Sequence, residues 1–175
     1  MRIESWVGVT AVLLLMFGGA IAADEQQRCL RSPLPANVDM PRDLERVIRR
    51  IYARSPAFRA QCERIASADN LRVTVRIDTS IPSRCRAFTI VRRRGYEIYA
   101  DVHLPPSSGL TELVAHEFEH VLEQIEGLDL RRLARVKGSG VRMLEGRLFE
   151  TDRAQAAGRV VAAEASDHRR MPAAD

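Results

Sequence analysis

The chain has 175 residues, of which 46% are hydrophobic and 29% charged, enough for one compact domain with its own core. Its formal net charge of +4 is modest, and nearly all of its cationic residues are arginines. No aromatic residues are interleaved with the arginines as a base-stacking platform requires, so we expect no nucleic-acid partner.

The first 22 residues predict an export signal. Arg2 precedes an apolar stretch over residues 6–22, which ends in Ala20-Ile21-Ala22 before Ala23, a small-residue pattern typical of a cleavage site. We therefore expect a signal peptide over residues 1–22 and a mature protein that is secreted or periplasmic. Contact with a membrane is expected only if the segment stays uncleaved as an anchor.

Three cysteines, Cys29, Cys62 and Cys85, follow the predicted cleavage site. An exported chain meets an oxidising compartment, which favours one disulfide and leaves one thiol free. We expect Cys62 to pair with Cys85, with Cys29 as the alternative partner.

The elements are predicted from hydrophobic periodicity. Residues 23–40 are polar and contain proline, which predicts an extended arm. A helix is expected from about Arg42, and a second begins at Ser55-Pro56, a capping residue followed by a first-turn proline. Alternating apolar residues then predict three strands, the last two joined by a turn at Arg94-Gly95. These strands are expected near residues 71–77, 86–92 and 96–104.

Another helix is capped by Ser107 or Ser108 and runs to about Glu126, before Gly127. A last long helix is predicted over residues 144–165, followed by a flexible tail over residues 166–175. The order of elements predicts an α+β fold. A domain over residues 41–165 would pack a three-stranded sheet against these two helices.

The helix ending near Glu126 carries the H-E-x-x-H motif, His116-Glu117-Phe118-Glu119-His120. Residues four apart lie one turn apart on the same helix face, so His116 and His120 can bind one Zn²⁺. Glu117 lies beside them, where a carboxylate can take a proton from a water molecule. Other glutamates of this helix are expected to face solvent: Glu112, Glu119, Glu123 and Glu126.

A catalytic zinc site usually needs a third protein ligand. Glu123 and Glu126 occupy the positions where the extended motif H-E-x-x-H-x-x-G-x-x-H has its glycine and third histidine, so that arrangement is excluded. We predict Glu150 as the third ligand, on a face of the last helix with Ala154, Ala157 and Val161. Competing side chains are Glu145, Asp152, His168 in the tail, and His103, which would be exposed or line the cleft.

These residues resemble a small version of the gluzincin-type zincin metallopeptidases, over residues 71–165 approximately. His116 and His120 match the zinc ligands of that family, Glu117 matches its general base, and Glu150 matches its distal glutamate. The resemblance implies a mixed sheet against the motif helix, bound Zn²⁺, and an extended peptide or protein substrate paired with a strand beside the cleft.

The strand predicted over residues 96–104 is our choice for pairing with substrate. Tyr99 and His103 are the candidates for stabilising the oxyanion. Ala154 stands where some relatives have an aspartate, so the partner that orients the ligand histidines is not identified.

The predicted function is thus an exported zinc-dependent metallopeptidase. One alternative is a non-catalytic zinc- or protein-binding domain of the cell envelope. Another is an interaction module whose basic hairpin, Arg92-Arg93-Arg94, binds anionic envelope polymers.

Overall fold

The computed structural model describes residues 34–81, 86–144 and 148–167. The predicted signal peptide, Cys29, Cys85, Glu145 and His168 lie outside these ranges. Within them, no helix is long and apolar enough to cross a membrane.

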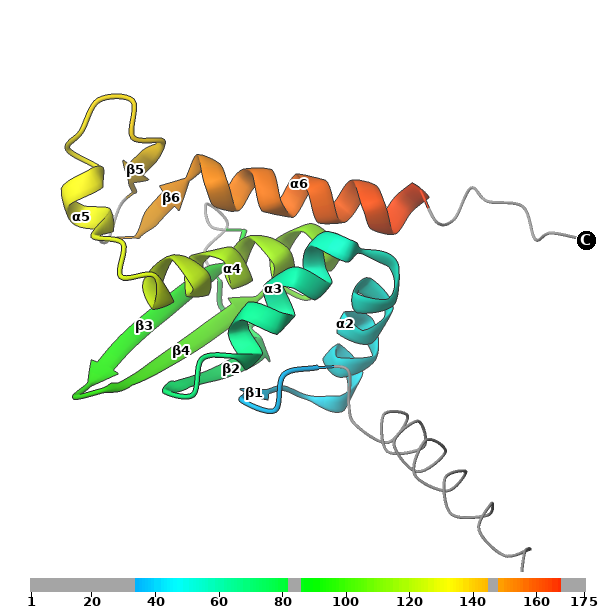
Figure 1. The fold of residues 1–175 in the computed structure, drawn as a ribbon. Helices are drawn as coiled ribbons and strands as arrows, with labels where there is room; N and C mark the ends of the chain where they lie inside the picture. Colours follow the sequence, from blue (N-terminus) through cyan, green and yellow to red (C-terminus); the bar gives the residue numbers. More distant parts are fainter. Residues whose placement is uncertain (1–33, 82–85, 145–147, 168–175) are drawn as a thin grey trace, which may run out of the picture. The chain divides into compact units, whose positions relative to one another are not determined.

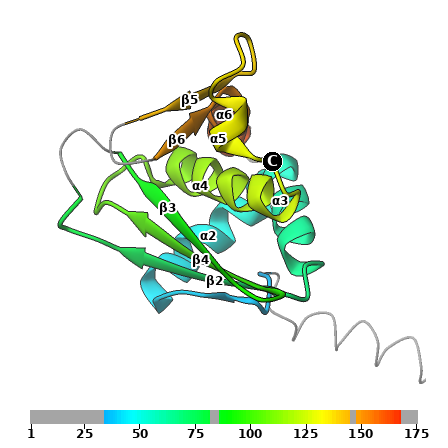
Figure 2. The ribbon, with the colours of Figure 1, turned by 90° about the vertical axis from the view of Figure 1, so that its left-hand side faces the viewer.

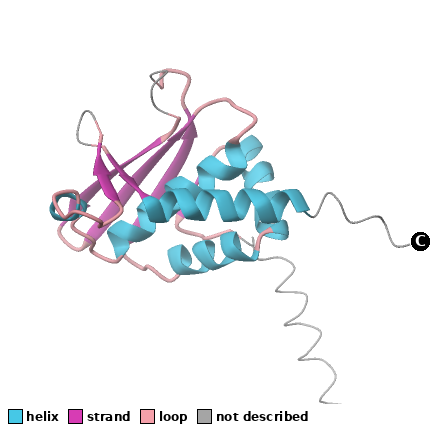
Figure 3. Ribbon diagram, turned by 90° about the horizontal axis from the view of Figure 1, so that it is seen from above, coloured by secondary structure: helices cyan, strands magenta, loops and turns pink. Residues whose placement is uncertain are grey.

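The described chain has the predicted α+β fold, with helices layered on a mixed sheet (Figure 1). Seen from above, the helices overlie the strands (Figure 3). In chain order the elements are β1 (Val38–Asp39), α2 (Arg42–Arg54), α3 (Pro56–Ala66), β2 (Leu71–Ile77), β3 (Phe88–Arg94), β4 (Glu97–Leu104), α4 (Leu110–Ile125), α5 (Leu130–Leu133), β5 (Val141–Met143), β6 (Phe149–Thr151) and α6 (Asp152–Asp167).

The main sheet has the strand order β1-β2-β4-β3 (Figure 2). β1, β2 and β4 are parallel, and β3 runs antiparallel to β4 at one edge. The prediction of three strands was wrong, because residues 38–39 of the supposed arm pair with β2 as a fourth strand. A two-residue strand is too short to show alternation, so the pattern of apolar residues could not predict it.

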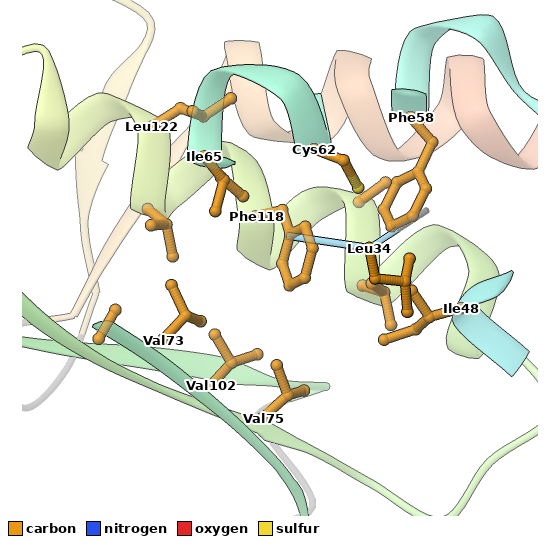
Figure 4. Close-up of a cluster of buried hydrophobic side chains, with 14 of the residues drawn as sticks. Leu34, Ile48, Phe58, Cys62, Ile65, Val73, Val75, Val102, Phe118 and Leu122 are labelled. Atoms are coloured by element: carbon orange, nitrogen blue, oxygen red, sulfur yellow. The ribbon is translucent and has the colours of Figure 1, made fainter. Parts of the chain in front are cut away.

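Alternation decides which face of the sheet the helices cover. Val73 and Val75 of β2 and Val102 of β4 are buried and point toward α3 and α4 (Figure 4). There they meet Phe58 of α3 and Phe118 of α4, whose rings stack with centroids 5.6 Å apart. The motif helix is therefore anchored by its apolar face, which leaves its other faces for the site.

Ser55 caps α3 as predicted. Its hydroxyl accepts a hydrogen bond from the Phe58 N–H at 3.0 Å, and Pro56 occupies the first turn. Ser55 also donates to Glu164 of α6, which accepts from the Ala57 N–H as well, at 3.1 Å. The expected serine cap of α4 was wrong: the residue at that position is Gly109, which has no side chain to form a cap.

The predicted helix over residues 144–165 was wrong at its start. β5 and β6 form a two-stranded antiparallel ladder, and the helix begins only at Asp152. Thr151 ends β6 and caps α6, because its hydroxyl accepts from the Ala154 N–H at 2.9 Å. Glu150 therefore lies on a strand immediately before the helix and not on a helical face.

α6 packs closely along α4. The two helices come close together at Gly158, where a Cβ would lie 2.9 Å from the backbone oxygen of Glu112 and 3.4 Å from the Cβ of His116. Such separations require a residue without a side chain, so Gly158 sets the spacing of the two helices next to the motif.

The expectation that the motif helix presents its glutamates to solvent is confirmed for Glu126, which is exposed, and was wrong for Glu119 and Glu123. Glu119 and Glu123 are only 5% and 1% exposed. Glu119 accepts hydrogen bonds from Gln61 of α3 and Arg153 of α6, both at 2.6 Å. Gln61 and Arg153 come from distant elements, so helical periodicity alone could not show that Glu119 is buried.

Cys62 is a free thiol in this structure, 2% exposed inside the core. Burial raises the pKa of the Cys62 thiol to about 12, with a smaller contribution from the nearby charge of Glu63. Cys85, the predicted disulfide partner of Cys62, lies outside the described residues.

Candidate metal centre

α4 presents the two motif histidines side by side. His116 and His120 are one helical turn apart, and their rings meet edge to face with centroids 4.9 Å apart. The two side chains are 17% and 12% exposed, so each is largely shielded but reachable from the cleft. Their Nε2 atoms both point toward Glu150.

β6 brings Glu150 to the histidines. Its Oε1 atom lies 3.5 Å from His116 Nε2 and 4.0 Å from His120 Nε2. Asp152, the nearest competitor, pairs with Arg142 at 2.7 Å instead. The sequence therefore predicted which carboxylate lies beside the histidines but placed it on the wrong element, because Glu150 reaches the site from a strand.

These three residues fit a zinc ion by donor chemistry and by distance. One ligand atom from each lies within 4.8 Å of the others. Tetrahedral bonds of about 2.0–2.1 Å place neighbouring ligand atoms about 3.4 Å apart, so only small side-chain movements would be needed. Two imidazole nitrogens and one carboxylate oxygen are a ligand set typical of catalytic zinc, and they leave a fourth position open.

A buried carboxylate orients His120. Glu123 Oε2 accepts a hydrogen bond from His120 Nδ1 at 2.8 Å, and Glu123 Oε1 accepts one from the Thr151 hydroxyl at 2.6 Å. A proton on Nδ1 leaves Nε2 with a free lone pair facing Glu150. Thr151 directly follows Glu150, so the same carboxylate ties the strand that carries one proposed ligand to the helix that carries another.

Glu117 is held beside the histidines at 2% exposure. Its Oε2 atom accepts a hydrogen bond from the Thr89 hydroxyl of β3 at 2.6 Å. Burial raises the pKa of the Glu117 carboxyl to about 7, against the lowering effects of His120 and Thr89. A carboxyl poised near neutral pH can both accept and release a proton.

The environment shifts the pKa values of the two histidines in opposite directions. Burial lowers the pKa of His116, and this effect outweighs the raising effect of the Glu150 charge. Burial also acts to lower the pKa of His120, but its hydrogen bond to Glu123 and the surrounding carboxylates raise it overall. Glu123 thus distinguishes the environments of the two imidazoles.

A cleft of about 820 Å³ opens over these residues. α4 forms its floor, the edge strand β3 one wall, and β6 with α6 the opposite wall. β3 is an edge strand of the sheet that the described residues form and borders the cleft through residues 88–91, while β4 lies between β2 and β3. The expectation that the strand 96–104 pairs with substrate was therefore wrong, because both edges of that strand are already paired.

Tyr99 and His103 lie on the other face of the sheet. They alternate with Ala100 and Val102, which are buried under the helices. His103 pairs with Asp78 at 2.8 Å and stacks on Phe88, and neither Tyr99 nor His103 lines the cleft. The expected oxyanion role of Tyr99 and His103 was therefore wrong, and so was the alternative that His103 lines the cleft.

Three site residues escaped the sequence analysis: Thr89, Glu123 and Thr151. Glu123 carried a usable signal, since it lies three residues after His120 and residues at that spacing share a helix face. Thr89 and Thr151 had no such signal, because each meets its partner across 28 residues of chain.

Comparison with known proteins gives no match: no protein-family model, no curated protein and no solved structure matches this chain.

Proposed function

We propose that this protein is a zinc-dependent metallopeptidase whose metal is held by His116, His120 and Glu150, with Glu117 as general base. The observation that carries the proposal is the convergence of three ligand atoms within 4.8 Å of one another, next to a buried carboxylate and beneath an 820 Å³ cleft. A helix that used this motif only for packing would not need a strand 30 residues away to supply a third ligand.

Several residues have separate roles in the proposed reaction. Zinc, when bound, would polarise the scissile carbonyl and make water a stronger acid. Glu117 takes the proton of the attacking water and passes it to the departing amine, while Thr89 holds its carboxylate in place. Glu123 keeps the His120 ring in the orientation that points Nε2 into the site.

The substrate class follows from the shape of the cleft. An exposed strand edge offers unpaired N–H and C=O groups to an extended peptide, and β3 presents such an edge directly beside Glu117. An extended peptide or protein segment fits between β3 and the opposite wall better than a compact small molecule.

The gluzincin-type zincins remain the family that this arrangement resembles. The mixed sheet, the edge strand along the cleft and the distal glutamate support the resemblance. The position of Glu150 on β6 departs from it, since the distal glutamate of that family lies on a helix. Export to the periplasm or exterior belongs to the same proposal, and N-terminal sequencing of the exported protein should find a chain that begins at Ala23.

Two variants separate the metal from the chemistry. His116→Ala should lose zinc, because it removes one of three protein ligands, whereas Glu117→Gln should keep about one zinc ion per chain and lose hydrolysis. Metal content measured by mass spectrometry and cleavage of a peptide library are the two readouts.

The outcomes decide between enzyme and binder. Hydrolysis that survives Glu117→Gln would remove the proposed base. A wild-type protein that binds zinc tightly and cleaves no peptide would favour the alternative, a non-catalytic zinc-binding domain of the cell envelope. A protein that binds no zinc after loading and dialysis would exclude both.

A further inference from the structure

The two ends of the cleft differ in chemistry. Near the C-terminal half of α4, apart from Gln124 of that helix, its lining is apolar and comes from α5, β6 and the adjoining segments: Leu130, Leu144, Leu148 and Phe149. Near the N-terminal half of α4, where Ala87 and Leu113 also line the cleft, four polar or charged side chains are present: Arg86, Glu112, Gln155 and Arg159. A peptide lying along the cleft would therefore meet different surfaces on the two sides of Glu117.

Among the described residues, ion pairing leaves the positive charge of Arg159 unneutralised at the polar end. Arg86 and Glu112 neutralise each other at 3.0 Å. Arg159 is exposed, and it makes no ion pair with any residue in the described part of the chain. It follows Gly158 directly, and the close contact of Gly158 with Glu112 and His116 fixes this part of α6 beside the site.

The direction of β3 decides which part of a peptide reaches Arg159. Arg86 contacts Glu112, Thr89 contacts Glu117, and Arg93 donates to the Gln124 carbonyl, so the β3 segment and α4 run the same way. An added strand pairs most favourably in the antiparallel sense. Its residues on the C-terminal side of the scissile bond then lie toward Arg86 and Arg159, and those on the N-terminal side lie toward the apolar end.

We infer that Arg159 is a specificity-determining residue that selects a carboxylate on the C-terminal side of the scissile bond, with apolar residues favoured on the N-terminal side. This inference rests on the proposed peptidase function. The carboxylate can come from an aspartate or glutamate side chain or from the free C-terminus of a short peptide. The guanidinium suits either, because it recognises a planar carboxylate with two parallel hydrogen bonds.

The test uses fluorescence-quenched peptides that carry leucine or phenylalanine before the scissile bond and aspartate, glutamine or lysine after it. A second set ends soon after the scissile bond, with either a free or an amidated C-terminus. For an exposed ion pair we expect kcat/KM to favour the carboxylate by about fivefold, and the preference should shrink at high salt. Preference in the first set indicates a side-chain carboxylate, and preference in the second indicates a terminal one.

Arg159→Gln should abolish the preference, and Arg159→Glu should reverse it toward lysine. Arg50→Glu is the matched control, because Arg50 is exposed on α2 and does not line the cleft, yet the net charge changes equally. Binding of the same peptides to Glu117→Gln, followed by fluorescence anisotropy, provides a second readout that needs no turnover.

Cleavage without any carboxylate preference, or a preference that Arg159→Gln leaves intact, would overturn the inference while the peptidase function stands. Preferential binding without cleavage would support the role of Arg159 and overturn the peptidase function. Neither binding nor cleavage of any peptide would overturn both.

Discussion

Glu123 connects two parts of the proposed metal centre, so Glu123→Gln tests the whole arrangement. The carboxylate accepts from His120 Nδ1 at 2.8 Å and from the Thr151 hydroxyl at 2.6 Å, at 1% exposure. An amide has only one oxygen. If that oxygen faces His120, the Thr151 hydroxyl loses its acceptor. If the amide nitrogen faces His120 instead, Nδ1 must accept, the proton moves to Nε2, and the ligand atom is blocked.

Either orientation weakens the site. Loss of a hydrogen-bond partner that orients a metal ligand typically lowers metal affinity about 10- to 100-fold, which is about 1.4–2.7 kcal/mol. The free energy of unfolding of the metal-free protein should also fall by about 1–3 kcal/mol, because a buried hydrogen bond to a charged group is lost. Competition with a zinc-binding dye measures the affinity, and urea denaturation followed by circular dichroism measures the stability.

Glu126→Gln is the control. Glu126 lies one turn further along the same helix and pairs with Arg64 and Arg153. Its loss changes the same charge on the same element without touching His120, so zinc affinity should stay within about twofold. If Glu123→Gln binds zinc as wild type does, or if both variants weaken it equally, the proposed role of Glu123 in orienting His120 is refuted.

Three further predictions concern the scaffold. Gly158→Ala should destabilise the protein by about 1–3 kcal/mol and weaken zinc binding. The reason is that a Cβ would lie 2.9 Å from the Glu112 backbone oxygen and push α6 away from α4. An unchanged denaturation midpoint would contradict this spacing. Ser55→Ala should cost about 1–2 kcal/mol in urea denaturation, since it removes the α3 cap and the bond to Glu164, and Ser67→Ala, at an exposed position after α3, is the control. The Cys62 thiol is 2% exposed and has a pKa of about 12, so it should resist iodoacetamide at pH 8 in reduced, folded protein and react only after unfolding. Peptide mapping that finds Cys62 alkylated under native conditions would contradict this and show that the core around α3 opens readily.

Local spacing was enough to predict the motif and most of the elements. The four-residue separation of His116 and His120 places them on one helix face in any α-helix, whatever surrounds it. Alternation over residues 71–77 likewise predicted β2, and Ser55-Pro56 predicted the start of α3. Each of these features depends on neighbours within about one or two turns, so the sequence alone carries the information.

The roles of the glutamates depended on contacts that local spacing does not contain. In the sequence, Glu119 and Glu123 look like glutamates on the solvent-facing side of a helix. They are buried only because α3 and the β6–α6 segment pack against α4. The edge position of β3 also emerged only from the sheet, because strand order depends on which long-range pairings form.

Glu150 illustrates both what the sequence can predict and what only the tertiary structure decides. The sequence by itself predicted that Glu150 lies beside the histidines, because the proposed zinc site needs a third ligand, and the structure confirms this proximity. The tertiary structure alone decided how it gets there. The β5–β6 ladder, the Thr151 bond to Glu123 and the close approach at Gly158 together place a strand end beside His116, and each of these contacts joins residues that are distant in the chain or on separate elements.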